Sequence, residues 1–160
     1  MPSHPLLTAL SAPDLWARLQ AECALAGADR ALIPALIALV GDANAAIEAR
    51  WRAAMILGEL GDADAVDALM TAAADPVWDV RHSAVWSLGM IGDARAFDLL
   101  LRVASTGTDE QVPYVAALAL GQIDRGRALT VLGQLFAAPP GDAARRTAHS
   151  ARVTIEEMTR

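Results

Sequence analysis

Lysine is absent from this chain, and cysteine occurs only once, at Cys23. All 13 basic residues are arginine, and 19 acidic residues leave a formal net charge of −6. An acidic chain is a poor candidate for nucleic-acid binding, because neutralising phosphates requires a basic face. The single cysteine excludes disulfides within the chain and cysteine-rich metal sites. It lies in an apolar helical stretch, which indicates a small buried hydrophobe rather than a reactive thiol.

Several other signals are also missing. No apolar run approaches the roughly 20 residues of a membrane span, and the opening MPSHPLL lacks the features of a signal peptide. We therefore expect a cytoplasmic protein. His4, His82 and His149 lie far apart, and no His-x-x-x-His or Glu-x-x-His pair occurs. The sequence predicts no metal, no cofactor and no catalytic residue, since phosphate loops and nucleophile elbows are also missing.

What the chain does contain is a repeat. The dipeptide Leu-Gly recurs at Leu57-Gly58, Leu88-Gly89 and Leu120-Gly121, with intervals of 31 and 32 residues. Aligning the copies places small and apolar residues in common columns. These columns are Ala53, Ala84 and Ala116; Leu60, Ile91 and Ile123; Asp62, Asp93 and Asp124; Val66, Phe97 and Leu129; and Leu69, Leu100 and Leu132. A fixed period of this size predicts an array of repeated units.

Each copy reads as a pair of helices. Helical spacing in the central copy puts Val80, Ala84, Leu88 and Ile91 on one apolar stripe. Gly92-Asp93 then ends the first helix and offers a cap for the second. The motif that carries the pattern is Asp75-Pro76, Val80-Arg81, Ala84, Leu88-Gly89, Ile91-Gly92-Asp93 and Leu100.

This motif resembles the HEAT repeat, and in particular the short HEAT-like subtype of the phycobilisome lyases. The resemblance implies an all-α fold, a right-handed solenoid of antiparallel helix pairs with about nine helices. Two departures stand out in the third copy: Pro113 replaces the arginine of the motif, and Arg125-Gly126 replaces the usual turn order.

The predicted organisation is a single HEAT-like domain over residues 1–160. Ser11 would cap an N-terminal helix that runs to about Ala26 and turns Trp16, Leu19 and Cys23 inward. The parts are an N-terminal cap helix (1–28), a partial repeat (29–42), three repeats (43–75, 76–107 and 108–140) and a C-terminal cap helix (141–160).

The most unusual residues are aromatic. On a helical wheel, Trp78, His82 and Trp86 fall opposite the core stripe at spacing i, i+4, i+8. The outer face of the array would carry a band of seven residues: Trp51, Met55, Trp78, His82, Trp86, Tyr114 and Leu118. Such a patch is a liability unless a partner covers it, and tryptophan and tyrosine commonly anchor interfaces. The alternative that some rings pack between adjacent first helices remains open.

The second helices carry polar residues of alternating sign. Asp67, Asp98, Arg102 and Gln134 would lie on the side that is concave in HEAT-like arrays, either gripping a partner or simply solvated. The resemblance also implies a structural ladder of aspartate and arginine between repeats. Its members would be Asp42, Arg50, Asp75 and Arg81, and Pro113 would remove a rung.

Three functions are compatible with these features. The leading hypothesis is a non-catalytic scaffold that binds a protein partner, or a second copy as a homodimer, through its aromatic face. The resemblance suggests a second, a bilin lyase-like subunit that handles a chromophore. A HEAT-like DNA glycosylase is a third, prompted by Trp78, Asp79 and Arg81, but the acidic charge argues against it.

Overall fold

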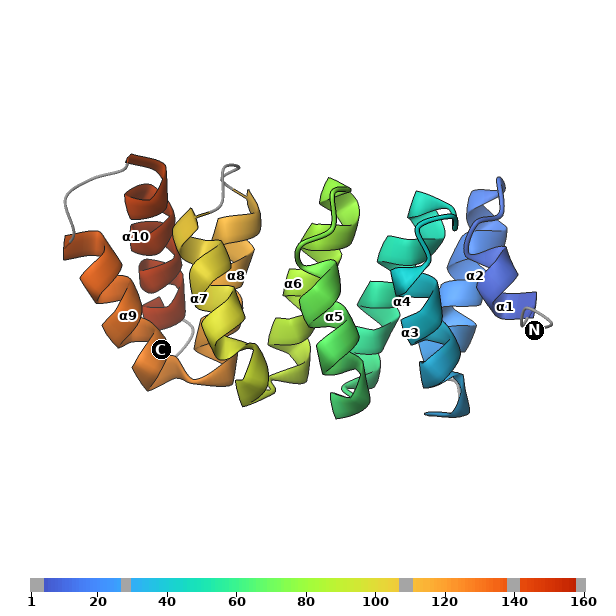
Figure 1. Ribbon diagram of the computed structural model, residues 1–160, viewed down its shortest axis with the longest axis horizontal. Helices are drawn as coiled ribbons and strands as arrows, with labels where there is room; N and C mark the ends of the chain where they lie inside the picture. The colour runs from blue at the N-terminus through green and yellow to red at the C-terminus, as the bar shows by residue number, and fades with distance from the viewer. Residues whose placement is uncertain (1–4, 27–29, 107–110, 138–141, 158–160) are drawn as a thin grey trace.

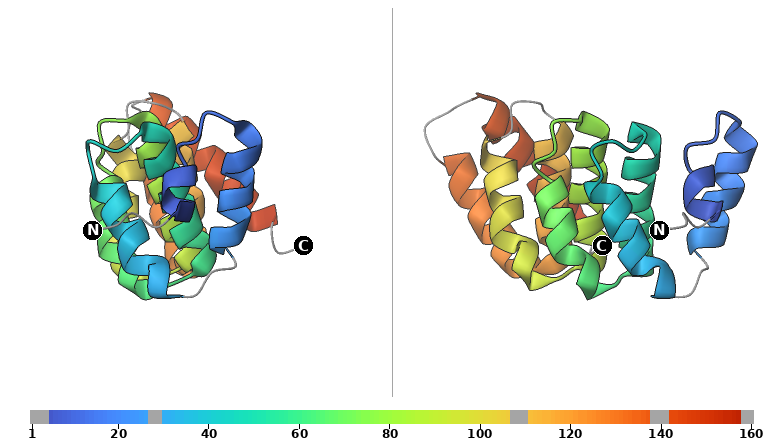
Figure 2. Two further views of the ribbon diagram at one scale, coloured as in Figure 1. Left: turned by 90° about the vertical axis from the view of Figure 1, so that its right-hand side faces the viewer. Right: turned by 45° about the vertical axis from the view of Figure 1, so that its right-hand side comes forward.

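The helices form two layers (Figures 1 and 2). The computed structural model describes residues 5–26, 30–106, 111–137 and 142–157, and in these ranges it contains helices and no strands. The first layer is α2 (Leu15–Ala26), α4 (Ile47–Leu60), α6 (Trp78–Ile91), α8 (Gln111–Ile123) and α10 (Asp142–Glu157). The second layer is α3 (Ile33–Gly41), α5 (Val66–Ala72), α7 (Phe97–Thr106) and α9 (Arg125–Ala137). The predicted all-α solenoid is therefore confirmed.

The N-terminal end differs from the sequence prediction. Ten α-helices are present in the described residues instead of about nine, because α1 (Pro5–Ala9) precedes α2 and packs against it. Ser11 does not cap α2; its hydroxyl donates to the Thr8 carbonyl, 3.4 Å away. Asp14 caps α2, since its carboxylate accepts the Ala17 amide at 3.0 Å. The side chains of Trp16, Leu19 and Cys23 lie outside the described part of the structure.

Turns between paired helices follow the Gly-Asp pattern in the first two full copies. Gly61 and Gly92 end α4 and α6 in the left-handed conformation, with φ of 65° and 71°. Asp62 and Asp93 then each accept the backbone amide two residues later, both at 2.9 Å. In the third copy Asp124 accepts the Arg127 amide at 3.0 Å and caps α9 directly. The departure at Arg125-Gly126 is therefore a different cap, which needs no left-handed glycine.

The aligned apolar columns form the core. Leu57, Leu88 and Leu120 are completely buried, as are the three alanines of the first column. In the second helices Leu69, Leu100 and Leu132 are also completely buried. One column differs in the third copy: Leu129 is half-buried, where Val66 and Phe97 are buried. The preceding alanines, Ala65, Ala96 and Ala128, are buried in all three copies, so the register of the core is unchanged.

The glycines of the Leu-Gly dipeptides are where successive first helices come closest. A Cβ on Gly58 would lie 2.6 Å from the Ser87 Oγ and 2.8 Å from the Ser87 Cα. A Cβ on Gly89 would lie 2.7 Å from the Ala119 Cβ, and one on Gly121 would lie 2.8 Å from the Ile155 side chain. At Gly58 the contact includes backbone, so rotating a side chain cannot relieve it. The repeated glycine thus sets the spacing of α4, α6, α8 and α10.

The predicted ladder residues have distinct partners. Arg50 is buried on α4, donates to the Val40 carbonyl at 3.0 and 3.1 Å, and forms an ion pair with Asp75 of the next repeat. Arg81 donates to the carbonyls of Asp75 and Pro76, at 2.8 and 2.9 Å. Asp42 is exposed and accepts the amide of Asn44. The inter-repeat rung in this region is therefore Arg50–Asp75.

Asp75 is held in its ionised form. Burial by itself raises the pKa of this carboxyl, but the hydrogen bond from Arg50, the amide of Val77 and the charges of Arg50 and Arg81 outweigh burial. The net effect is a pKa below the usual value, so the folded state binds this proton less readily than the unfolded state. The ionised Asp75 therefore stabilises the fold at pH values above its pKa in the unfolded state. This stabilisation is lost as the pH falls through its lower pKa in the folded state.

None of the described helices is both long enough and apolar enough to span a membrane.

Replacing Gly58 with alanine is expected to destabilise the array. The added methyl group would force α4 and α6 apart, a cost of about 1–3 kcal/mol that exceeds the gain of about 1 kcal/mol in helix propensity. Gly133→Ala in α9 is the matched control, because nothing lies within 4 Å of its Cβ position, and it should stabilise the protein. Urea denaturation followed by circular dichroism measures both. A Gly58→Ala midpoint at or above that of the parent would contradict the proposed close contact.

Replacing Asp75 with asparagine should cost about 3 kcal/mol at neutral pH, because Arg50 keeps its charge and loses its partner. Asp67→Asn is the control, since the Asp67 side chain is 82% exposed beside Arg95, and it should cost under about 1 kcal/mol. As the pH falls below the unfolded-state pKa of about 3.9 and through the lower pKa of the folded state, the parent loses the Asp75 charge, so the difference in stability between the parent and Asp75→Asn should shrink. Denaturant titrations across this pH range measure it. A difference that stays constant into acid would be evidence against the rung.

Candidate protein-interaction face

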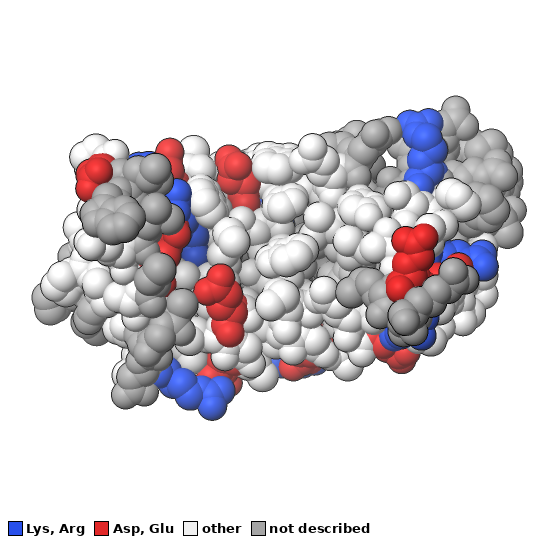
Figure 3. Space-filling view, turned by 180° about the vertical axis from the view of Figure 1, so that it is seen from behind, with Lys and Arg blue, Asp and Glu red and all other residues white. Residues whose placement is uncertain are grey.

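The exposed sides of α4, α6 and α8 form one continuous surface. Helical spacing at i, i+4 lines up one stripe of side chains on each helix, away from the second layer. The stripes are Ile47, Trp51, Met55 and Glu59 on α4; Trp78, His82, Trp86 and Met90 on α6; and Tyr114, Leu118 and Gln122 on α8. We call this surface the first-helix face. Figure 3 shows the molecule from the side of the first layer, and its middle is mostly free of charged side chains.

Large apolar side chains are exposed on one layer of the array. Trp78 is 37% exposed, Trp86 42% and Met90 49%. Among the side chains that the structure describes, the exposed large apolar residues are Ile47, Met55, Trp78, Trp86, Met90 and Val153. All six lie on α4, α6 or α10, which are first-layer helices. Trp51, His82, Tyr114 and Leu118 are half-buried.

A small cavity opens on the first-helix face between α4 and α6. Its volume is about 260 Å³, and Met55, His82, Ser83 and Trp86 line it. Ser83 forms the floor and is 95% buried, since only 5% of its surface is exposed. The two helices lie close together because Gly58 meets Ser87 one turn further along α6. The cavity therefore has room for one large apolar side chain, and its floor is a buried residue of α6.

Two aromatic residues on this face are held by neighbours. The rings of Trp78 and His82 stack with centroids 4.9 Å apart and an interplanar angle of 23°. The Arg52 guanidinium lies 4.3 Å from the Trp51 ring centroid, and Arg52 also pairs with Glu22 of α2. Pre-positioned rings lose little conformational entropy when a partner binds.

The last helix limits the extent of the face. The Tyr114 hydroxyl lies 3.1 Å from the Thr154 hydroxyl of α10, and α10 packs against both α8 and α9. Tyr114 and Leu118 are therefore partly covered from within the chain. The most accessible part of the predicted band is the region over α4 and α6.

Sequence reasoning missed two exposed members of these stripes. Met90 continues the series Trp78, His82, Trp86 by one more step of four, and Ile47 begins the series that holds Trp51 and Met55. Both are exposed. The same i, i+4 rule, applied one turn further in each direction, finds them.

The exposed charges on α4 and α6 are all acidic. Glu48, Glu59 and Asp79 are exposed, and α8 contains no charged residue. The arginines of these helices are withdrawn: Arg50 is buried against Asp75, and Arg52 is paired with Glu22. Arg81 is half-buried and donates to backbone carbonyls. The first-helix face is thus apolar in the middle with acidic side chains around it.

The second-layer surface has a different character. Arg95 pairs with Asp93 at 3.0 Å and with Asp67 of α5 at 3.3 Å. Arg127 pairs with Asp98 of α7 at 2.8 Å. The Arg127 guanidinium also lies 3.8 Å from the Phe97 ring centroid. Arg102 and Gln134 are exposed on α7 and α9. The alternating signs of these helices therefore pair between repeats, which leaves less charge available to an outside ligand.

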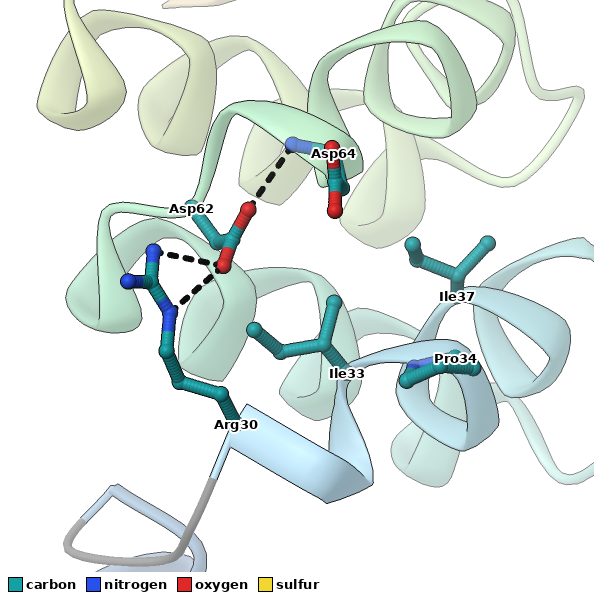
Figure 4. Close-up of a pocket in the computed structure, with 6 residues that line it drawn as sticks. All are labelled: Arg30, Ile33, Pro34, Ile37, Asp62 and Asp64. Carbon is teal, nitrogen blue, oxygen red and sulfur yellow. Dashed lines mark hydrogen bonds and ion pairs between the residues drawn. The ribbon is translucent and has the colours of Figure 1, made fainter.

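A second hollow, of about 710 Å³, lies beside α3 (Figure 4). Arg30 reaches across it and donates to the Asp62 carboxylate at 2.8 Å, while the amide of Asp64 donates to the same carboxylate at 2.9 Å. The pKa of the Asp62 carboxyl lies below its usual value. The hydrogen bond from the Asp64 amide is the largest cause; burial acts in the opposite direction, and Arg30 lowers the pKa further. Ile33, Pro34 and Ile37 complete the lining. The Arg30 guanidinium, the Asp62 carboxylate and the Asp64 amide therefore already bind one another and fix the turn before α5.

The Ser87 hydroxyl has a structural role. The Ser87 hydroxyl donates to the Ala54 carbonyl at 2.8 Å and is completely buried. Within the described ranges, no three His, Cys, Asp or Glu residues gather as a metal site would require.

Comparison with known proteins extends these observations. The sequence model of HEAT repeats matches residues 33–117 and again residues 73–152. No match is found among curated protein sequences. Among solved structures, the complex of CpcE and CpcF of phycocyanin lyase from Nostoc sp. PCC7120 is 27% identical, with a TM-score of 0.65. That match covers 95% of this chain and 64% of the other.

Human deoxyhypusine hydroxylase in complex with glycerol is a second similar structure. It is 26% identical with a TM-score of 0.67, and the match covers 79% of this chain and 44% of the hydroxylase. This chain therefore spans less than two thirds of either protein. Both are enzymes by name, so the shared fold occurs in catalytic proteins as well as in scaffolds. Since the two family matches together take in residues 33–152, the chain belongs to the HEAT-repeat family.

Proposed function

We propose that this protein is a non-catalytic scaffold that binds another protein, or a second copy of itself, through the first-helix face. The observation that carries the proposal is the one-sided exposure of large apolar residues. Ile47, Met55, Trp78, Trp86 and Met90 are all exposed on α4 and α6. Contiguous exposed apolar surface on a small protein marks an interaction site.

The geometry of the face supports binding to a macromolecule. The exposed stripes on α4 and α6 run side by side, because the contact of Gly58 with Ser87 holds the two helices together. A flat apolar surface with one small cavity suits a side chain presented by a protein, since an anchor residue in a pocket is the usual centre of an interface. An enzyme site would need convergent polar groups, and the nearest ones here are His82 and Ser83 alone.

Likeness to a two-subunit complex adds support. The phycocyanin lyase structure is a complex of CpcE and CpcF, and 95% of this chain aligns with one chain of it. By analogy we infer that this chain also works in association with another polypeptide. Association through the first-helix face would cover the two exposed tryptophans.

A second candidate is a subunit that handles a bilin. The similarity to phycocyanin lyase and the cavity beside His82 and Trp86 favour it. The cavity volume of about 260 Å³ lies below the roughly 300–1,000 Å³ of typical small-molecule pockets. A chromophore would therefore lie across the face rather than inside the cavity.

If the protein handles a bilin, mixing a free bilin with the protein should shift and sharpen the visible absorbance of the bilin. The reason is that the rings of Trp78 and Trp86 would hold the bilin out of water. Trp86→Ala should reduce the shift, and Thr71→Ala on the exposed side of α5 should not. An absorbance spectrum identical with and without the protein removes this candidate and leaves the scaffold proposal intact.

The scaffold proposal predicts where contacts form in cells that produce the protein. A photo-reactive amino acid in place of Met90, which is 49% exposed, should crosslink to a second polypeptide. The same amino acid in place of Thr71, exposed on α5, should not. Replacing both Trp78 and Trp86 with alanine should remove the Met90 crosslink, since truncating an interface anchor typically costs more than 2 kcal/mol.

Mass spectrometry of the crosslinked product separates a partner from a second copy, and light scattering of the purified protein measures self-association independently. Crosslinks that form equally from position 71, or none from position 90, would refute the assignment of the binding face.

A further inference from the structure

We propose that the occupant of the first-helix face is an amphipathic helix of another protein, with an apolar anchor for the Met55–Trp86 cavity and basic side chains that meet Glu59. This inference rests on the proposed function and adds the chemistry of the partner. It depends on three observations: the shape of the groove, the sign of the charges beside it and the unusual position of Glu59.

The groove between the α4 and α6 stripes fits a helix. Met55 and Trp86 stand on its two sides, and Ser83 and His82 form its base and wall. The stripe on α6 extends from Trp78 to Met90, which is the length of more than three helical turns. The cavity lies partway along this stripe, so the surface offers one hollow for an anchor with apolar side chains on either side of it, which matches an apolar stripe at spacing i, i+3, i+4, i+7, the standard mode of helix recognition.

Glu59 is not explained by the stability of its own helix. It lies in the last turn of α4, where the helix macrodipole favours a basic residue and disfavours an acidic one. It is exposed, and it has no hydrogen-bond or ion-pair partner within the described part of the chain. It also stands one helical turn beyond Met55, on the same stripe as the cavity. A carboxylate in this position is available to a cation on a bound partner.

The remaining charges of the groove have the same sign. Asp79 lies in the first turn of α6, one turn before Ser83 of the cavity, so the other end of the groove is also acidic. The net charge of −6 acts in the same direction at longer range. A basic partner gains from this field, and an acidic partner is repelled by it.

These charges also disfavour a second copy as the occupant. The first helices run parallel to one another, with Asp79 at one end of the groove and Glu59 at the other. A two-fold pairing that aligns two such grooves, parallel or antiparallel, therefore brings acidic ends against acidic ends. Self-pairing would gain the apolar contact but would also place like charges together. A partner with basic flanks gains both the apolar contact and the attraction between opposite charges.

The test is a displayed library of short amphipathic helices in two formats, panned on the full-length protein. Both formats carry the same randomised apolar stripe, and the flanking positions hold lysine in one and glutamate in the other. Each enriched helix is then tested on the Trp86→Ala variant, and circular dichroism confirms that this variant is folded. The expected result is enrichment of the lysine format only, with affinity that falls as salt is added.

Individual binders then report on Glu59. Glu59→Gln should weaken lysine-flanked helices about two- to fivefold, the range of an exposed ion pair. Glu157→Gln is the matched control, because Glu157 is an exposed carboxylate in the last turn of α10, and it should leave the affinity unchanged. Binding that is the same for Glu59→Gln and the parent would overturn the assignment of the basic flank.

Failure of this inference is distinguishable from failure of the proposed function. Enrichment of glutamate-flanked helices that still require Trp86 overturns the charge argument and leaves the face as a protein-binding site. Self-association that requires Trp86, with no helix enriched, makes a second copy the occupant and also overturns the inference. Helices that bind without any dependence on Trp86, Trp78 or Met55, in a protein that does not self-associate, overturn both.

Discussion

The contact of a glycine on one first helix with the next first helix is the constraint on which the rest of this structure depends. Gly58 against Ser87, Gly89 against Ala119 and Gly121 against Ile155 occur at the same place in each step of the array. In a solenoid each unit contacts only its neighbours, so stability is the sum of such steps. The contact fixes both the distance and the register between units, and the Leu-Gly repeat follows from this requirement.

Register then determines what is left exposed. Leucines beside the glycines turn into the core, so the side chains on the opposite surface of each first helix have no intramolecular partner layer. On α6 these are Trp78, His82, Trp86 and Met90, and the neighbouring α4 places Met55 next to Trp86. The cavity between them exists because two backbones approach at glycine while two large side chains rise on either side. The fold and the candidate site therefore share one geometric cause.

Much of the fold could be predicted from sequence, because period and helical spacing are local signals. The buried leucine column and the Gly-Asp turns follow this rule. Predictions that needed a neighbour's position were weaker. Whether Trp86 is exposed depends on how closely α4 approaches, and the pairing of Arg50 with Asp75 crosses between repeats. The partial covering of Tyr114 depends on α10, which the repeat period does not place.

Composition alone does not account for the exposed apolar residues. With 54% hydrophobic residues, a chain of this size could place some on any surface. In that case the second layer would expose large apolar side chains as often as the first. Among its side chains that the structure describes it exposes none, and its surface carries pairs such as Arg127–Asp98 instead. The two layers belong to the same repeats and share one core. The difference in exposed apolar side chains therefore comes from the residues at their outer surfaces. Among the described residues one surface is charged and paired, and the other is apolar and holds no partner for the Glu59 carboxylate, which is the asymmetry expected of a surface that a partner covers.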